Sequence, residues 1–127
     1  MAFNFDKYAN TGKQFMHELT EELGYANEPE RAARVLKSVL HTLRDHLTIE
    51  ESLQLLAQLP MFLKAVYVDG WSGKQHKKIK HLNDFLSEIH QHDGFPAADD
   101  FGDGKETLAL TVMVFLMLRK YVSEGEM

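Results

Sequence analysis

The segment PERAARVLKSVLHTLRDHLTIEE, residues 29–51, decides the fold class. Its apolar residues recur at steps of three and four, the period of an α-helix with one buried face. Pro29 suits a first helical turn, and Asn27 is the expected N-cap, with Glu30 three residues after it. The segment therefore predicts a helix that starts after Asn27 and ends near Leu47. Its apolar stripe is Ala32, Val35, Leu36, Val39, Leu40, Leu43 and Leu47.

A capping box directly after this helix predicts the start of another. The Thr48 hydroxyl and the Glu51 carboxylate have the spacing in which each accepts a hydrogen bond from the other's backbone amide. The new helix should end at Pro60, because proline lacks an amide hydrogen, and a further short helix should follow it up to Gly70. The apolar residues predicted for these two helices are Leu53, Leu56, Leu59, Phe62, Leu63, Val66 and Tyr67.

Two similar amphipathic segments lie on either side of this centre. Residues 13–23 have helical spacing and are followed by Gly24, and residues 82–89 have it again before Gly94. Glycine is the usual residue after a helix C-terminus, so both segments are predicted helices.

The remainder of the second half is predicted to be a loop and a long helix. The acidic, glycine-rich residues 96–104 have the composition of a loop, and the last helix runs over about residues 105–122. We therefore expect an all-α fold, a bundle of about six helices in a single domain spanning residues 1–127.

The two halves resemble each other, which indicates an internal duplication of about residues 11–70 and 81–127. Any two amphipathic helix pairs share some spacing, but a glycine followed by an aromatic residue recurs in both halves and favours duplication. We expect the second unit to be incomplete, because its predicted capping box at residues 123–126 is followed only by Met127. The matched pairs include Phe15 and Phe85, Leu19 and Ile89, Gly24 and Gly94, Tyr25 and Phe95, Val39 and Val114, and Arg44 and Arg119.

The last helix is apolar nearly all round, so it should be covered on more than one side. Because the second repeat lacks the helix that would cover one flank, we expect a protein partner or a second copy of the chain there. Phe115 and Tyr121 are the candidate contact residues on this helix.

Composition narrows the classes of protein. The 127 residues contain no cysteine, which excludes disulfides and thiolate metal sites, and the formal net charge of -5 argues against nucleic-acid binding. The longest apolar run, residues 108–118, is too short to span a membrane, and residues 1–8 do not read as a secretory signal. A cytoplasmic protein without membrane contact is expected.

A family resemblance rests on the segment VLHTLRDHLTIEESLQLL AQLPMFLKAVYVDGW, residues 39–71. Its marks are Leu43-Arg44 before Thr48, Gln58-Leu59-Pro60, Tyr67 and Gly70-Trp71, and with them nearly the whole chain resembles a bacterial family catalogued as domain of unknown function 2267. The resemblance implies a small helical domain with a duplicated unit and no established activity. Longer relatives carry a second helix that ends in a similar Gln-Leu-Pro.

No catalytic, cofactor-binding or metal site is predicted. The histidines are spaced so that no two share one helical face, and a solvated surface position is expected for them. Residues 99–104 resemble a calcium loop, but Phe101 occupies a ligand position and Leu110 stands in place of the bidentate glutamate. The glycine pattern of a phosphate-binding loop is missing around Lys74.

These observations predict a non-catalytic protein-interaction or regulatory module. Aromatic residues beside an irregular turn are typical of interaction surfaces, although Trp71 could instead fold a loop onto the core. One alternative is a ligand-binding protein or enzyme with a pocket between the repeats that uses Gln58, Tyr67 and His81. Another is nucleic-acid binding through Lys74 to Lys80, for which a solvated connector is the competing interpretation. The candidate interaction surface comprises Gln58, Pro60, Tyr67, Trp71, Phe115 and Tyr121.

Overall fold

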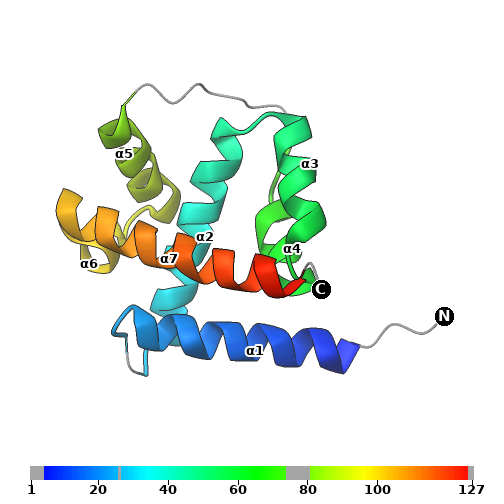
Figure 1. Cartoon of the computed structure of the whole chain (residues 1–127). Coiled ribbons are helices and arrows are strands. Elements are labelled where there is room, and N and C mark those ends of the chain that lie inside the picture. Colours follow the sequence, from blue (N-terminus) through cyan, green and yellow to red (C-terminus); the bar gives the residue numbers. More distant parts are fainter. Residues whose placement is uncertain (1–4, 26, 74–80, 126–127) are drawn as a thin grey trace.

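A computed structural model describes residues 5–25, 27–73 and 81–125. Over these residues the chain is all-helical, which confirms the predicted fold class (Figure 1). None of the described helices combines the length and the apolar character that crossing a bilayer requires. The helices are α1 (Phe5–Glu22), α2 (Pro29–His46), α3 (Ile49–Gln58), α4 (Met61–Val68), α5 (Leu82–Asp93), α6 (Ala97–Phe101) and α7 (Gly104–Gly125).

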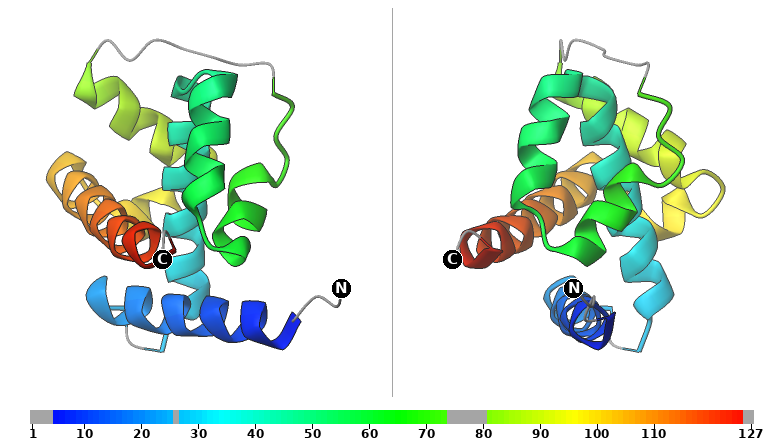
Figure 2. Two further views of the ribbon diagram at one scale, coloured as in Figure 1. Left: turned by 45° about the vertical axis from the view of Figure 1, so that its right-hand side comes forward. Right: turned by 90° about the vertical axis from the view of Figure 1, so that its right-hand side faces the viewer.

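Helix α2 is the centre of the bundle. It packs against α1, α4, α5, α6 and α7, and the views in Figure 1 and Figure 2 show α1 across one end of it and α7 crossing beside its middle. The stripe predicted on α2 therefore contacts both halves of the chain. The apolar side chains with no exposed surface are Phe15, Leu19, Ala32, Val35, Val39, Leu40, Leu63, Tyr67, Ile89, Phe101 and Val114.

The predicted capping box is present at the start of α3. The Glu51 amide donates to the Thr48 hydroxyl over 3.1 Å, and the Thr48 amide donates to the Glu51 carboxylate over 2.9 Å. Pro60 then separates α3 from α4, as predicted. Leu53 differs from the expectation, because its side chain is 57% exposed on the outer side of α3.

The starts of the first two helices differ from the prediction. Helix α1 begins at Phe5, well before the expected residues 13–23. Asn27 is not the N-cap of α2: Glu28 holds that position without a side-chain hydrogen bond. The reason is that Asn27 has a positive φ of 66°, whereas an N-cap residue needs extended backbone to turn its side chain onto the helix.

The predicted loop at residues 96–104 is wrong, because it contains the short helix α6 and brings the number of described helices to seven. Phe101 is fully buried and Asp100 is 2% exposed. The Tyr25 hydroxyl donates to the Asp100 carbonyl over 2.7 Å, and Arg34 donates twice to the Asp100 carboxylate, over 2.7 and 2.9 Å. These long-range contacts hold residues of loop-like composition in a short helix against α2 and the turn that follows α1.

The prediction of solvated histidines is wrong for His41 and His46, which are 6% and 9% exposed. His41 Nε2 lies 2.8 Å from the Val66 carbonyl, so the ring joins α2 to α4, and burial lowers its pKa. The His46 ring pairs with Glu88 on α5. Both histidines therefore connect α2 to neighbouring helices.

Arg44 holds the C-terminus of α4 in place. Its Nη1 donates to the carbonyls of Tyr67 and Asp69, each over 2.8 Å. A helix leaves its last carbonyls without intrahelical partners, and this buried guanidinium satisfies two of them. Burial lowers the pKa of Arg44.

The internal duplication stays a prediction. Gly24 and Gly94 both have positive φ, of 76° and 74°, at the ends of α1 and α5. The aromatic residues after them are not equivalent, since Tyr25 is buried whereas Phe95 is fully exposed. The second predicted capping box lies outside the side chains that the structure describes.

Candidate functional site

The predicted interaction residues separate into interior and surface positions. Tyr67 has no exposed surface, and its hydroxyl lies 2.7 Å from that of Ser52. Trp71 is half-buried, with its ring edge-on to Tyr67 at 5.9 Å between centroids. The Tyr67 ring is therefore core, and Trp71 covers its edge after α4.

Three of the other predicted residues line one cleft. Gln58, Pro60 and Tyr121 lie around a space of about 530 Å³ between α1, the corner joining α3 to α4, and the end of α7. Sequence reasoning does not place α1 at this cleft, because its first turns lie outside the predicted helix over residues 13–23. The remaining lining residues are Lys7, Tyr8, Thr11, Gln14, Ala57, Leu59, Met61, Phe62 and Lys64.

The corner between α3 and α4 positions this cleft. Leu59 is extended, with φ −79° and ψ 145°, and Pro60, the N-cap of α4, has φ −58° and ψ 153°, so the chain leaves the helical conformation between α3 and α4. On the facing helix, a Cβ added to Gly12 would lie 3.0 Å from the Phe62 ring. Glycine at this position lets α1 approach α4 closely and fixes the two walls relative to each other.

The outer face of α7 is the second surface feature, and it includes the predicted residue Phe115. Residues 107–118 contain no charge. One side of this stretch, with Thr107, Thr111, Val114, Met117 and Leu118, is buried, and the opposite side is exposed to solvent. The outer face consists of Leu108 (38% exposed), Ala109, Val112 (46%), Met113 (37%), Phe115 (37%) and Leu116 (58%).

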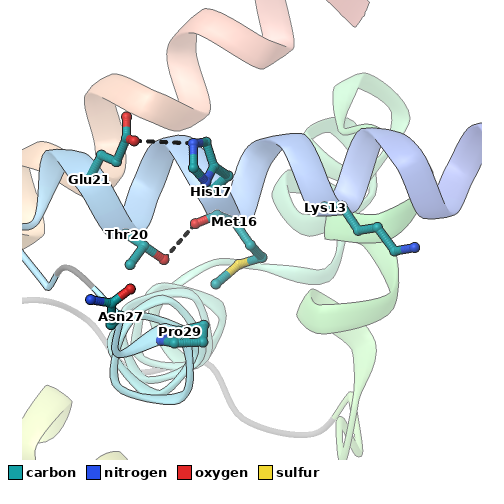
Figure 3. A pocket seen from close by; sticks show the side chains of 7 residues that line it. All are labelled: Lys13, Met16, His17, Thr20, Glu21, Asn27 and Pro29. Carbon is teal, nitrogen blue, oxygen red and sulfur yellow. Dashed lines mark hydrogen bonds and ion pairs between the residues drawn. The ribbon is translucent and has the colours of Figure 1, made fainter.

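A second hollow lies where α1 meets the start of α2, and Figure 3 shows its lining. His17 pairs with Glu21 over 3.1 Å, and the Thr20 hydroxyl donates to the Met16 carbonyl over 2.6 Å. These polar groups are satisfied within α1 itself. The hollow therefore lacks a convergent set of reactive groups; its residues are Lys13, Met16, His17, Thr20, Glu21, Asn27 and Pro29.

Two carboxyl groups meet where α5 and α6 approach α2. Burial, together with the neighbouring Asp100 carboxylate, raises the pKa of Asp93 to about 7. Burial disfavours the charged form of Asp100 as well, but hydrogen bonds from Arg34 offset this and hold the pKa of Asp100 below its usual value. Asp100 is thus ionised and Asp93 retains a proton over the mildly acidic range.

This pair makes stability depend on pH. Between pH 3.8, the ordinary pKa, and about 7, Asp93 keeps its proton in the folded chain and loses it in the unfolded chain. The contribution of Asp93 to the free energy of unfolding therefore falls as pH rises through that window. We expect Asp93→Asn to raise the free energy of unfolding at pH 8 relative to the wild type, and to change it much less at pH 5. Urea unfolding at both pH values measures this, with the exposed Asp99→Asn as control. The same change in the free energy of unfolding at both pH values, or a loss at pH 8, would contradict it.

Metal-ligating side chains do not cluster among the residues that the structure describes. Among residues 5–25, 27–73 and 81–125, no group of three or more His, Cys, Asp or Glu side chains could hold a metal ion. His81, proposed for a pocket, is exposed at the N-cap of α5, away from the cleft residues. The basic run Lys74 to Lys80 lies outside the described residues.

Fold and surfaces together define an all-helical protein with an uncharged exposed helix face and a cleft between its first and last helices. The pattern of the family described as uncharacterized conserved protein, DUF2267, matches residues 12–127. The chain belongs to this family. No match was found among curated proteins.

Proposed function

We propose that the protein is a protein-interaction module and that the outer face of α7 binds an amphipathic helix of another protein. The observation that carries this proposal is the exposure of Leu108, Val112, Phe115 and Leu116 along one side of a long helix. Exposed large apolar side chains scattered singly are normal, but a contiguous group marks a binding surface. A partner helix would cover the outer face of α7, as α2 and α1 cover its inner face.

The charges around this face identify the kind of helix that fits. Lys105 lies seven residues before Val112 and Arg119 seven residues after it. Seven residues are close to two helical turns, so all three lie on the same side of α7, with a positive charge at each end of the apolar residues. The two charges are separated by 14 residues, or about 21 Å along the helix axis. A fitting partner carries an apolar stripe with carboxylates at both ends.

The same charges argue against a second copy of this chain on this face. In an antiparallel pair of α7 helices, Lys105 of one copy would approach Arg119 of the other, and like charges at both ends of the contact would oppose pairing. Light scattering over a dilution series should therefore find a monomer. A dimer that Leu116→Glu dissociates would overturn the proposal and assign the face to self-association.

The binding test uses two synthetic helical peptides with the same leucine stripe, one flanked by glutamates 14 residues apart and one flanked by lysines. We expect the glutamate peptide to bind more tightly, and Leu116→Glu to weaken its binding at least tenfold because the variant places a charge in the contact. Leu82→Glu is the matched control, since Leu82 has nearly the same exposure (55%) but lies on α5. Calorimetric titration measures the affinities.

Reversing the charge at one end separates charge recognition from apolar contact. Arg119→Glu should weaken the glutamate peptide and strengthen the lysine peptide. Equal affinity of both peptides for the wild type, or no binding of either at millimolar concentration, would contradict the proposed function. Circular dichroism of each variant establishes that the helices are retained.

A further inference from the structure

We infer that a groove between α1, α2 and α4 binds a short apolar peptide whose amino and carboxyl termini are both free. The groove has a volume of about 520 Å³, within the range of sites that hold small ligands. Its described lining includes no residue of α7, so the inference does not depend on the proposed function. The lining residues are Met16, Ala33, Leu36, Lys37, Phe62, Ala65, Val66 and Asp69.

The floor of the groove is apolar and rigid. Leu36 is 2% exposed, and Phe62 packs on the fully buried Phe15 with ring centroids 5.5 Å apart. Ala33 on α2 and Ala65 on α4 end in a methyl group, and this leaves between the helices a space that longer side chains would fill. Apolar side chains of a ligand can therefore enter without rearrangement of the core.

Two exposed charges of opposite sign border this floor, Lys37 on α2 and Asp69 at the C-cap of α4. Within the described residues, neither side chain forms a hydrogen bond or an ion pair. Arg44 attracts the Asp69 carboxylate from the interior, but Arg44 is only 7% exposed and donates to the Asp69 carbonyl instead. A ligand with one carboxylate and one ammonium group would be attracted at both borders.

The register of α2 and α4 gives the spacing of these charges. His41 contacts the Val66 carbonyl and Arg44 contacts the Asp69 carbonyl, each pair 25 residues apart, so the two helices run side by side in the same direction. Asp69 is thus level with Arg44, and Lys37 lies seven residues earlier, about 10 Å along the axis. An extended peptide of three residues spans about the same length. Its carboxylate would face Lys37 and its ammonium group Asp69.

The neighbouring hollows lack this combination of charges. In the hollow of Figure 3, which shares Met16 with the groove, the Glu21 carboxylate is already paired with His17 over 3.1 Å. The cleft at Gln58 contains lysines but no carboxylate among its described lining residues, and so does the hollow at Leu56. A ligand with two opposite charges therefore fits the groove better than these neighbours.

The test titrates the chain at low ionic strength with the tripeptide Leu-Ala-Leu in four forms: free, N-acetylated, C-terminally amidated, and capped at both ends. Each exposed charge contributes up to about fivefold in affinity, so the free peptide should bind at least tenfold more tightly than the doubly capped one. NMR should show shifts of backbone amides in residues 33–37 and 62–69. Equal affinity of the free and doubly capped peptides, or shifts confined to another surface, would overturn the inference.

Variants assign each terminus to its residue. Lys37→Met should weaken the free peptide about fivefold and leave the amidated peptide unchanged, because the amide has no carboxylate to lose. Asp69→Asn should do the same for the free peptide while leaving the acetylated one unchanged. Lys13→Met, in the hollow of Figure 3, is the matched control. If it weakens binding as much as Lys37→Met, the peptide responds only to overall charge and the inference fails.

Filling the groove provides a test that does not depend on charge. Ala33→Phe places a ring in the space at an exposed position of α2, and it should abolish binding of all four peptides. Circular dichroism establishes that this variant keeps its helices. Unchanged binding by a folded Ala33→Phe would place the peptide elsewhere. Leu116→Glu, which tests the proposed function, should leave the affinity for Leu-Ala-Leu unchanged.

Discussion

Phe15→Ala should lower the free energy of unfolding by about 3–5 kcal/mol, the cost of removing a fully buried phenylalanine and leaving a cavity. Phe15 has no exposed surface and packs on both Phe62 and Tyr121. Its ring therefore joins α1 to α4 and to α7. Loss of the ring removes contacts to both halves of the chain, and the surrounding side chains cannot close the space without moving two helices.

Urea unfolding measured by circular dichroism tests this expectation. Phe95→Ala is the matched control, because Phe95 is fully exposed after α5 and the same truncation should change stability by less than about 0.5 kcal/mol. Similar losses in the two variants would show that Phe15 is not a central core residue.

Arg44→Met should lower the free energy of unfolding by about 3 kcal/mol. The guanidinium is 7% exposed and donates to the carbonyls of Tyr67 and Asp69. Methionine fills a similar volume but donates nothing, so two carbonyls at the end of α4 lose their partner while the Tyr67 carbonyl stays buried. The cost comes mainly from these unsatisfied acceptors rather than from the lost charge.

Arg119→Met is the control for Arg44→Met, since Arg119 is exposed on α7. Its stability should stay close to that of the wild type. Hydrogen exchange adds a local measurement. Relative to the wild type, Arg44→Met should speed amide exchange in α4 more than in α5. Uniform protection across both helices would contradict the role assigned to Arg44.

The sequence predicted the helices because their signals are local. The stripe on α2, the capping box at Thr48 and the break at Pro60 each depend on residues within one or two turns. Gly24 and Gly94 mark helix ends for the same reason, since glycine adopts positive φ without steric cost. Local chemistry thus determined most element types and several of their boundaries.

The errors arose where distant residues decide the conformation. Helix α6 forms because Asp100 meets Arg34 and Tyr25, which are far away in the sequence. His41 occupied an apparently polar side of α2, but α4 packs there and buries it. Spacing within one helix cannot show which partner will cover a polar position, so the solvated assignment failed.

The candidate surfaces were predictable only in part. Gln58 and Pro60 were identified from an unusual turn, and the structure adds that α1 faces this turn with Lys7. Tyr67 fits both an apolar helix position and an aromatic contact residue by sequence, and the structure buries it completely in the core. The outer face of α7 did have a sequence signal, the absence of charge over residues 107–118, which distinguishes it from an ordinary amphipathic helix.

The pairing of the first and last helices has a consequence for synthesis on the ribosome. Lys120 and Glu18, which join α7 to α1 over 3.1 Å, are separated by 102 residues. At typical elongation rates, roughly 5–20 s therefore pass between the synthesis of α1 and the synthesis of the part of α7 that packs on it. During that interval the apolar side of α1 around Phe15 has no α7 to cover it, so the nascent chain exposes apolar surface that the finished protein buries.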